Sequence, residues 1–174
     1  MDRGSAFLRS RVSTAVAQHG MLLSALEDHE NQADDLRFRD LCSRHVPRIR
    51  EDQGTLEEYE SQLGADAGAA KRNPGVRFEG TRELADAARE SDFLRLVGDL
   101  AMARQAEDTF RTFREAGRMM GNRTLQEIGD AGERHQDAYV KEASRLVQHL
   151  FVEYTQGIDG AARRSTTVHL DVNP

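Results

Sequence analysis

The chain has little of what disulfide-rich, β-rich or membrane proteins need. It contains one cysteine, no tryptophan and three prolines, and 6% of its residues are aromatic. The single cysteine, Cys42, excludes an intramolecular disulfide framework and fits a reducing compartment. The scarcity of aromatic residues argues against a β-sandwich. No apolar run approaches the roughly 18 residues of a membrane span, and the first ten residues lack the apolar segment of a signal peptide. We therefore expect a cytoplasmic protein that is not embedded in a membrane.

Positive charge is also in short supply. The 24 Lys and Arg residues are outnumbered by 30 Asp and Glu residues, which gives a formal net charge of −6. Because affinity for nucleic acid comes mainly from neutralising phosphates, we expect no nucleic-acid partner. The 174 residues are 38% apolar and 31% charged, a balance that favours one domain of amphipathic helices.

Apolar residues recur every three or four positions in four segments, which predicts four amphipathic helices. The first begins at a Ser5 cap and ends in the polar cluster 27–35. The predicted stripes are Leu8, Val12, Val16, His19, Leu23, Leu26; Phe38, Leu41, His45, Ile49, Leu56, Leu63; Phe93, Leu96, Leu100, Ala103, Glu107, Phe110; and Leu125, Ile128, Gly132, His135, Tyr139, either Glu142 or Ala143, Leu146, Leu150.

The second helix is expected to start at an Asp34 or Asp35 cap, and Pro47 should kink or split it. The third should run from Asp92 to Met120, and the turn at Gly121 and Asn122 should lead into a fourth that fades near Gly157. Short connections favour antiparallel hairpins. We predict a bundle domain at 5–157, made of a hairpin at 5–63, a crossover at 64–91 in which Thr81 caps a short segment, and a hairpin at 92–157, followed by a tail at 158–174.

Each predicted stripe contains one side chain that is able to ligate a metal ion: His19, His45, Glu107 and His135. In both hairpins the two candidates lie at comparable distances from the turn, so all four should sit at a similar depth. Metal sites in helix bundles are built from side chains on facing helices. Imidazole and carboxylate groups suit Fe, Mn or Zn, and the pattern predicts one such ion per chain.

The open alternative is that each candidate is a separately satisfied buried polar group and that no metal binds. Arg104, one turn before Glu107, would then neutralise this carboxylate. We interpret Cys42 as a small buried apolar residue, and Asp52 and Glu133 as solvent-facing charges. The polar cluster 27–35 is interpreted as a solvated turn, because it lacks the ligand spacing of a calcium loop.

Three stretches resemble the YciF-type bacterial stress-associated proteins of the ferritin-like superfamily. QHGMLLSAL at 18–26 resembles the run A-E-K-Q-L-L-x-A-L of their first helix, and ARQAEDTF at 103–110 resembles a third-helix run that ends in V-E-H-Y. IGDAGERHQDAYV at 128–140 is similar to the fourth helix in outline. The resemblance implies an all-α, ferritin-like antiparallel four-helix bundle, a role in stress response and a homodimer.

The ferritin-like dimetal motif is degenerate in this chain. That motif places Glu on the first and third helices and E-x-x-H on the second and fourth. Glu107, His45 and His135 match it, and the other ligand positions hold His19, Cys42 and Gly132. Two divalent ions held close together need several carboxylates to offset their repulsion. The resemblance therefore implies a mononuclear or vestigial site.

Two functions follow from the sequence. The first is a stress-related bundle with a metal site in its core. The alternative is a metal-free bundle that acts as an interaction or assembly module. Under this alternative the outer face of the bundle and the tail would act, and the tail, in which Val168, Leu170 and Val172 alternate with polar residues, is expected to dock on a protein partner. No nucleotide-binding, serine-hydrolase or zinc-protease motif occurs, so no reaction is predicted.

Overall fold

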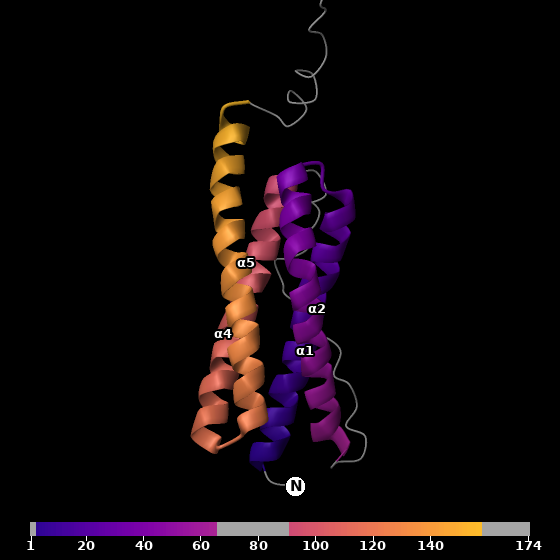
Figure 1. Cartoon of the computed structure of the whole chain (residues 1–174), viewed down its shortest axis with the longest axis vertical. Coiled ribbons are helices and arrows are strands. Elements are labelled where there is room, and N and C mark those ends of the chain that lie inside the picture. Colours follow the sequence, from indigo (N-terminus) through magenta and orange to yellow (C-terminus); the bar gives the residue numbers. More distant parts are fainter. Residues whose placement is uncertain (1–2, 66–90, 158–174) are drawn as a thin grey trace, which may run out of the picture.

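A computed structural model describes residues 3–65 and 91–157, and every regular element in these two ranges is an α-helix (Figure 1). The helices are α1 (Arg3–Gln32), α2 (Leu36–Ala65), α4 (Asp92–Met120) and α5 (Arg123–Thr155). The predicted all-α class is confirmed. None of these four helices combines the length and the apolar character that crossing a membrane requires. The predicted Thr81 segment, the crossover beyond residue 65 and the tail at 158–174 lie outside the described residues.

Several helix ends follow the predicted signals. Asp35 caps α2, because its carboxylate accepts a hydrogen bond from the backbone N–H of Arg37 at 2.8 Å. Gly121 ends α4 in the left-handed conformation with φ of 66°. The Asn122 side chain then caps α5 by accepting from the backbone N–H of Leu125 at 3.0 Å. The α4–α5 turn is therefore the predicted one.

The ends of α1 differ from the prediction. This helix begins at Arg3, so Ser5 lies inside it and is not the cap. It also continues through most of the polar cluster 27–35 as far as Gln32, so that cluster is largely helical and not a turn. Glu and Gln are good helix formers, and the Asn31 side chain donates to the backbone carbonyl of Glu27 at 2.8 Å.

Pro47 does not split α2, which is continuous from Leu36 to Ala65 and so also includes the first two residues of the predicted crossover. The proline removes one N–H donor from the helix. Val46 and Ile49 on either side of it are buried in the core, and their packing holds the two halves of the helix together.

The helices pack as two pairs, α1 with α2 and α4 with α5, and each pair is joined by a short turn (Figure 1). The pairs meet along two seams. On the α2–α5 seam Arg37 bonds Glu153 and Asp52 bonds His135, so these two helices are antiparallel. On the α1–α4 seam His29 bonds Asp99, and the ring of His19 packs against the ring of Phe110, so these helices are antiparallel as well.

The start of α4 and the end of α2 can each be assigned to one end of the bundle. α4 begins beside the end of α1, where Asp92 accepts from the backbone N–H of Asp35 at 2.6 Å. α2 finishes near the opposite end, where the Asn122 side chain donates to the hydroxyl of Tyr59 at 2.8 Å. The end of α2 and the start of α4 therefore lie at opposite ends of the bundle.

The buried residues form two apolar clusters that lie one above the other along the bundle. One cluster is built around Leu22, Ile49 and Tyr139, and the other around Val12, Leu56 and Phe113. Polar residues of α1, α2 and α5 occupy the level between the clusters. They are His19, Asp52, Gln53, His135 and Gln136. We call these five residues the polar layer.

The four helix contacts differ in how closely the backbones approach. α4 and α5 make the most extensive contact, and glycines lie along it. A methyl group added at Gly129 would overlap the backbone of Arg114, and one added at Gly117 would overlap the backbone of Gln126. The α1–α4 contact is the least extensive of the four. This difference leaves space between α1 and α4.

Candidate functional site

A cavity with a volume of about 380 Å³ lies between α1 and α4. We call it the α1–α4 pocket. Its walls are mostly apolar and include several small residues. They include Ala15, Met21 and Ala25 of α1, Gly98, Met102, Ala106 and Phe110 of α4, and Leu56 of α2. A mostly apolar cavity with a few polar groups is the usual form of a small-molecule site.

His29 and Asp99 form one polar end of the pocket. Nδ1 of His29 lies 2.7 Å from Oδ2 of Asp99, and the aspartate side chain is only 2% exposed. Burial raises the pKa of Asp99, and the hydrogen bond from His29 opposes this effect. The carboxyl group of Asp99 therefore binds a proton more readily than an exposed aspartate does. Sequence reasoning missed Asp99, and it assigned His29 to a solvated turn.

His19 lies at the other end of the pocket and belongs to the polar layer. Its Nδ1 donates to Oε1 of Gln53 at 2.9 Å, and its Nε2 accepts from the amide of Gln136 at 3.1 Å. Burial lowers the pKa of His19, so the ring is neutral with its proton on Nδ1. The prediction that His19 is buried is confirmed. Both ring nitrogens are engaged by side-chain amides.

His135 and Asp52 form the second histidine–carboxylate pair, on the α2–α5 seam. Nδ1 of His135 lies 2.9 Å from Oδ1 and 3.0 Å from Oδ2 of Asp52. The interpretation of Asp52 as solvent-facing is wrong, because its side chain is 5% exposed. Burial raises the pKa of Asp52 to about 6, and the hydrogen bond from His135 opposes the rise. A smaller cavity of about 220 Å³ adjoins this pair.

His45 lies in the apolar cluster around Ile49, away from the polar layer. Its Nε2 is 3.3 Å from Oε1 of Glu142, and its ring meets the ring of Tyr139 edge-on at 5.4 Å. Burial lowers the pKa of His45, and the charge of Glu142 partly offsets the effect. Cys42, one turn earlier, is buried as interpreted.

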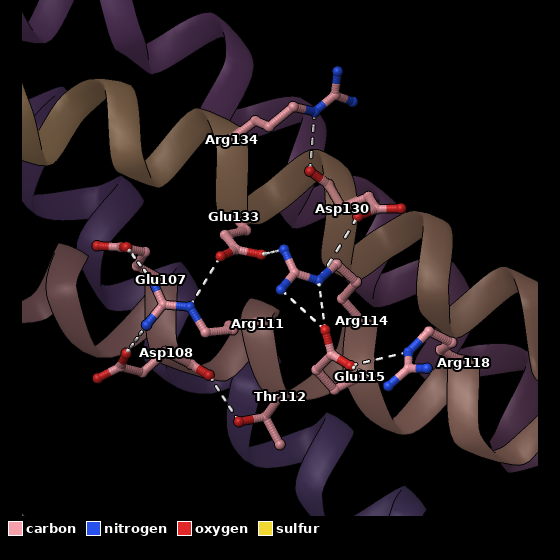
Figure 2. A network of polar contacts seen from close by, with 10 residues as sticks. All are labelled: Glu107, Asp108, Arg111, Thr112, Arg114, Glu115, Arg118, Asp130, Glu133 and Arg134. Carbon is pink, nitrogen blue, oxygen red and sulfur yellow. Dashed lines mark hydrogen bonds and ion pairs between the residues drawn. The ribbon is translucent and has the colours of Figure 1, made fainter.

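Glu107 does not lie in the buried stripe of α4, as the sequence pattern predicted. It lies at the edge of the α4–α5 contact, where Arg111 bonds it at 2.6 Å (Figure 2). An arginine does neutralise this carboxylate, as interpreted, but it is not the predicted one. The partner is Arg111, one turn later, whereas Arg104 donates to Ser144. The α4 carboxylate that is buried beside a histidine of α1 is Asp99, which contacts His29.

Figure 2 shows that Glu133 joins α5 to two arginines of α4. Its carboxylate accepts from Arg111 at 2.9 Å and also from Arg114. Its side chain is 15% exposed, so the interpretation of Glu133 as a solvated charge is wrong. The network is on the side of the bundle where the glycines bring α4 and α5 together, and it ties these two helices across their outer edge.

The four predicted metal ligands therefore occupy different environments. His19 is bonded to two amides, His135 to Asp52, and Glu107 to Arg111. In residues 3–65 and 91–157, no group of three or more His, Cys, Asp or Glu side chains is arranged to hold a metal ion. The metal site stays a prediction from the sequence. The α1–α4 pocket has the cavity and the perturbed polar groups of a binding site.

Comparison of the chain with protein-family models, with curated proteins and with solved structures finds no match. The geometry of the pocket is therefore the basis for assigning a function.

Proposed function

We propose that this chain is a ferritin-like four-helix bundle that binds an elongated apolar small molecule in the α1–α4 pocket. The observation that carries the proposal is the 380 Å³ cavity between two helices that make only limited contact elsewhere. This volume falls in the range of roughly 300–1,000 Å³ that is typical of small-molecule sites.

The ferritin-like arrangement is supported by the direction of the helices. α1 and α5 run one way and α2 and α4 run the other, and α2 ends at the opposite end of the bundle from the start of α4. In bundles of this type, ligand and cofactor sites are built between facing helices.

The pocket has a physical reason to persist without a ligand. α4 cannot move further toward α5, because their backbones already touch at Gly129 and Gly117. Small side chains at Ala25, Gly98 and Ala106 leave the space beside α1 unfilled. Filling such a cavity with a ligand removes apolar surface from water at about 0.8 kcal/mol for each buried CH₂ group.

Gly98 provides a direct test. It lines the pocket, and an added Cβ would meet no atom within 4 Å, so a larger side chain at this position enters open space. We expect the neutral dye N-phenylnaphthylamine to bind the full chain saturably at one molecule per chain, and Gly98→Leu to weaken this binding at least tenfold. Gly54→Leu is the matched control, because Gly54 lies on the exposed side of α2 and also has open space.

Three outcomes would overturn the proposal. The first is the absence of saturable dye binding. The second is equal weakening by Gly98→Leu and Gly54→Leu, since this would place the dye elsewhere. The third is loss of dye binding as the protein concentration rises, since this would assign the α1–α4 pocket to contact with a second copy of the chain. Circular dichroism of both variants checks that they retain the helical fold.

A further inference from the structure

We infer that the α1–α4 pocket selects an uncharged amphiphile, an elongated apolar body that ends in a hydroxyl or carbonyl group, over fatty acids and long-chain amines. This inference rests on the proposed function and specifies its ligand class. It combines the shape of the cavity with the way in which its charged groups are paired.

The pocket is elongated. Its α1 wall extends from Ala15 to His29, which corresponds to about 21 Å along a helix that rises about 1.5 Å per residue. An elongated apolar ligand fits along this wall.

The buried carboxylate at the polar end already has a partner. Oδ2 of Asp99 lies 2.7 Å from Nδ1 of His29, so the two side chains are hydrogen-bonded across the α1–α4 contact. Asp99 is almost completely buried and His29 is 17% exposed, so little water reaches the pair. The pair offers hydrogen-bonding atoms to a ligand without an unpaired ionic group.

The second charged group that lines this end is also balanced. Nη1 of Arg95 lies 3.2 Å from Oδ1 of Asp92, and Asp92 also accepts from the backbone N–H of Asp35. The guanidinium and the carboxylate compensate each other. Arg95 and His29 are therefore both committed to a carboxylate of α4.

A ligand that carried a full charge would bring an uncompensated ion into this apolar channel. A carboxylate head would meet the carboxylate of Asp99, and an ammonium head would meet the guanidinium of Arg95. Burying an unpaired ion costs far more than burying a hydroxyl or carbonyl group that finds a hydrogen bond. The His29–Asp99 pair provides that hydrogen bond.

Competition among three ligands of equal chain length tests the inference. Decanol, decanoate and decylammonium are each titrated against bound N-phenylnaphthylamine on the full chain, below the concentrations at which they form micelles. We expect decanol to displace the dye at a concentration at least tenfold lower than either ion. Equal or better displacement by decanoate or by decylammonium overturns the inference.

Two substitutions test whether the His29–Asp99 pair sets this preference. Asp99→Asn removes the negative partner and should improve competition by decanoate relative to decanol. His29→Gln removes the imidazole that bonds Asp99 and should improve competition by decylammonium, because the carboxylate then lacks this partner. Lys141→Gln breaks an exposed ion pair with Asp137 far from the pocket, and it should leave the ranking unchanged. If Asp99→Asn and His29→Gln leave the wild-type ranking unchanged, the inference is wrong.

The two proposals fail in distinguishable ways. If the dye does not bind saturably, or if Gly98→Leu has no effect, the pocket is not a ligand site. If Gly98→Leu abolishes dye binding but an ionic competitor is preferred, the pocket is a ligand site and only the neutral ligand class is wrong. The ranking with the wild-type chain stands even if a variant fails to fold.

Discussion

His19 and Gln136 are separated by 117 positions in the chain, and the amide of Gln136 donates to Nε2 of His19 across the bundle at 3.1 Å. Because Nδ1 of the same ring donates to Gln53, the imidazole is held neutral by its two neighbours. If Nε2 of His19 were protonated, it would become a donor that faces the donating amide of Gln136 in a buried position. This contact makes the middle of the bundle sensitive to acid.

We therefore expect the free energy of unfolding to fall as the pH drops below about 6.5. Burial lowers the pKa of His19 in the folded chain, so the unfolded chain binds a proton first. This stabilising contribution is fully present above the unfolded pKa and is lost as the pH falls toward the folded pKa. His19→Gln should weaken the dependence of the free energy of unfolding on pH, which is measured by urea unfolding at several pH values in this range. His149→Gln, at an exposed position, should leave that dependence unchanged, and the same dependence in the wild type and both variants would contradict the prediction.

The contribution of Asp52 to the free energy of unfolding should depend on pH in the opposite sense. Burial raises its pKa from 3.8 to about 6, so the stability that its protonated form contributes is complete below about pH 4 and is lost as the pH rises to about 6. Asn at this position carries no charge to bury. As the pH rises from about 4 to about 6, we expect the free energy of unfolding of Asp52→Asn to increase by about 1–3 kcal/mol relative to that of the wild type. Asp108→Asn, at an exposed position, is the control, and a constant difference across this range would refute the assignment.

Glycine substitutions should separate the tight helix contact from the open one. Gly129→Ala places a methyl group against the backbone of Arg114 and should cost about 1–3 kcal/mol. Gly98→Ala enters open space in the middle of α4 and should gain up to about 1 kcal/mol from helix propensity. Thermal unfolding measures both changes, with Gly54→Ala as the reference for propensity alone. A destabilising Gly98→Ala would show that the pocket is closed in solution.

The arginine network predicts unequal costs for two glutamates of similar exposure. Glu133 bonds both Arg111 and Arg114, so Glu133→Ala should cost about 1–3 kcal/mol. Glu107 bonds Arg111 alone, and Glu107→Ala should cost less than about 1 kcal/mol. Urea unfolding at low and high salt measures both. The prediction fails if Glu107→Ala is the more damaging of the two.

Sequence periodicity predicted the helices well but chose the wrong inward-facing residue in two of them. In α4 it selected Leu100 and Glu107, whereas Asp99 is buried and Leu100 is half-buried. At about 100° per residue, two adjacent positions can share the edge of a stripe, and the pattern favours the more apolar one. Asp99 is buried because it is paired with His29 on α1, and a pattern within one helix does not contain that partner.

The same displacement occurs in α5, where Gln136 occupies the core position and the predicted His135 flanks it. The hydrogen bond from Gln136 to His19 on α1 depends on the register between two hairpins that are far apart in the sequence. The metal site at His19, His45, Glu107 and His135, the homodimer and the tail-mediated partner stay predictions. The α1–α4 pocket could not be foreseen, because it arises from how closely α4 approaches α5.

The glycine contacts between α4 and α5 have a consequence for how this protein can diverge in sequence. At Gly117 and Gly129 the neighbour is backbone, so no change of rotamer makes room for a side chain. At Gly132 the neighbour is the ring of Phe110, so those two positions must change together if they change at all. A distant relative with the same helix spacing should keep glycine at the equivalents of 117 and 129, even after its surface has lost all similarity. These positions offer a signature by which such relatives can be recognised.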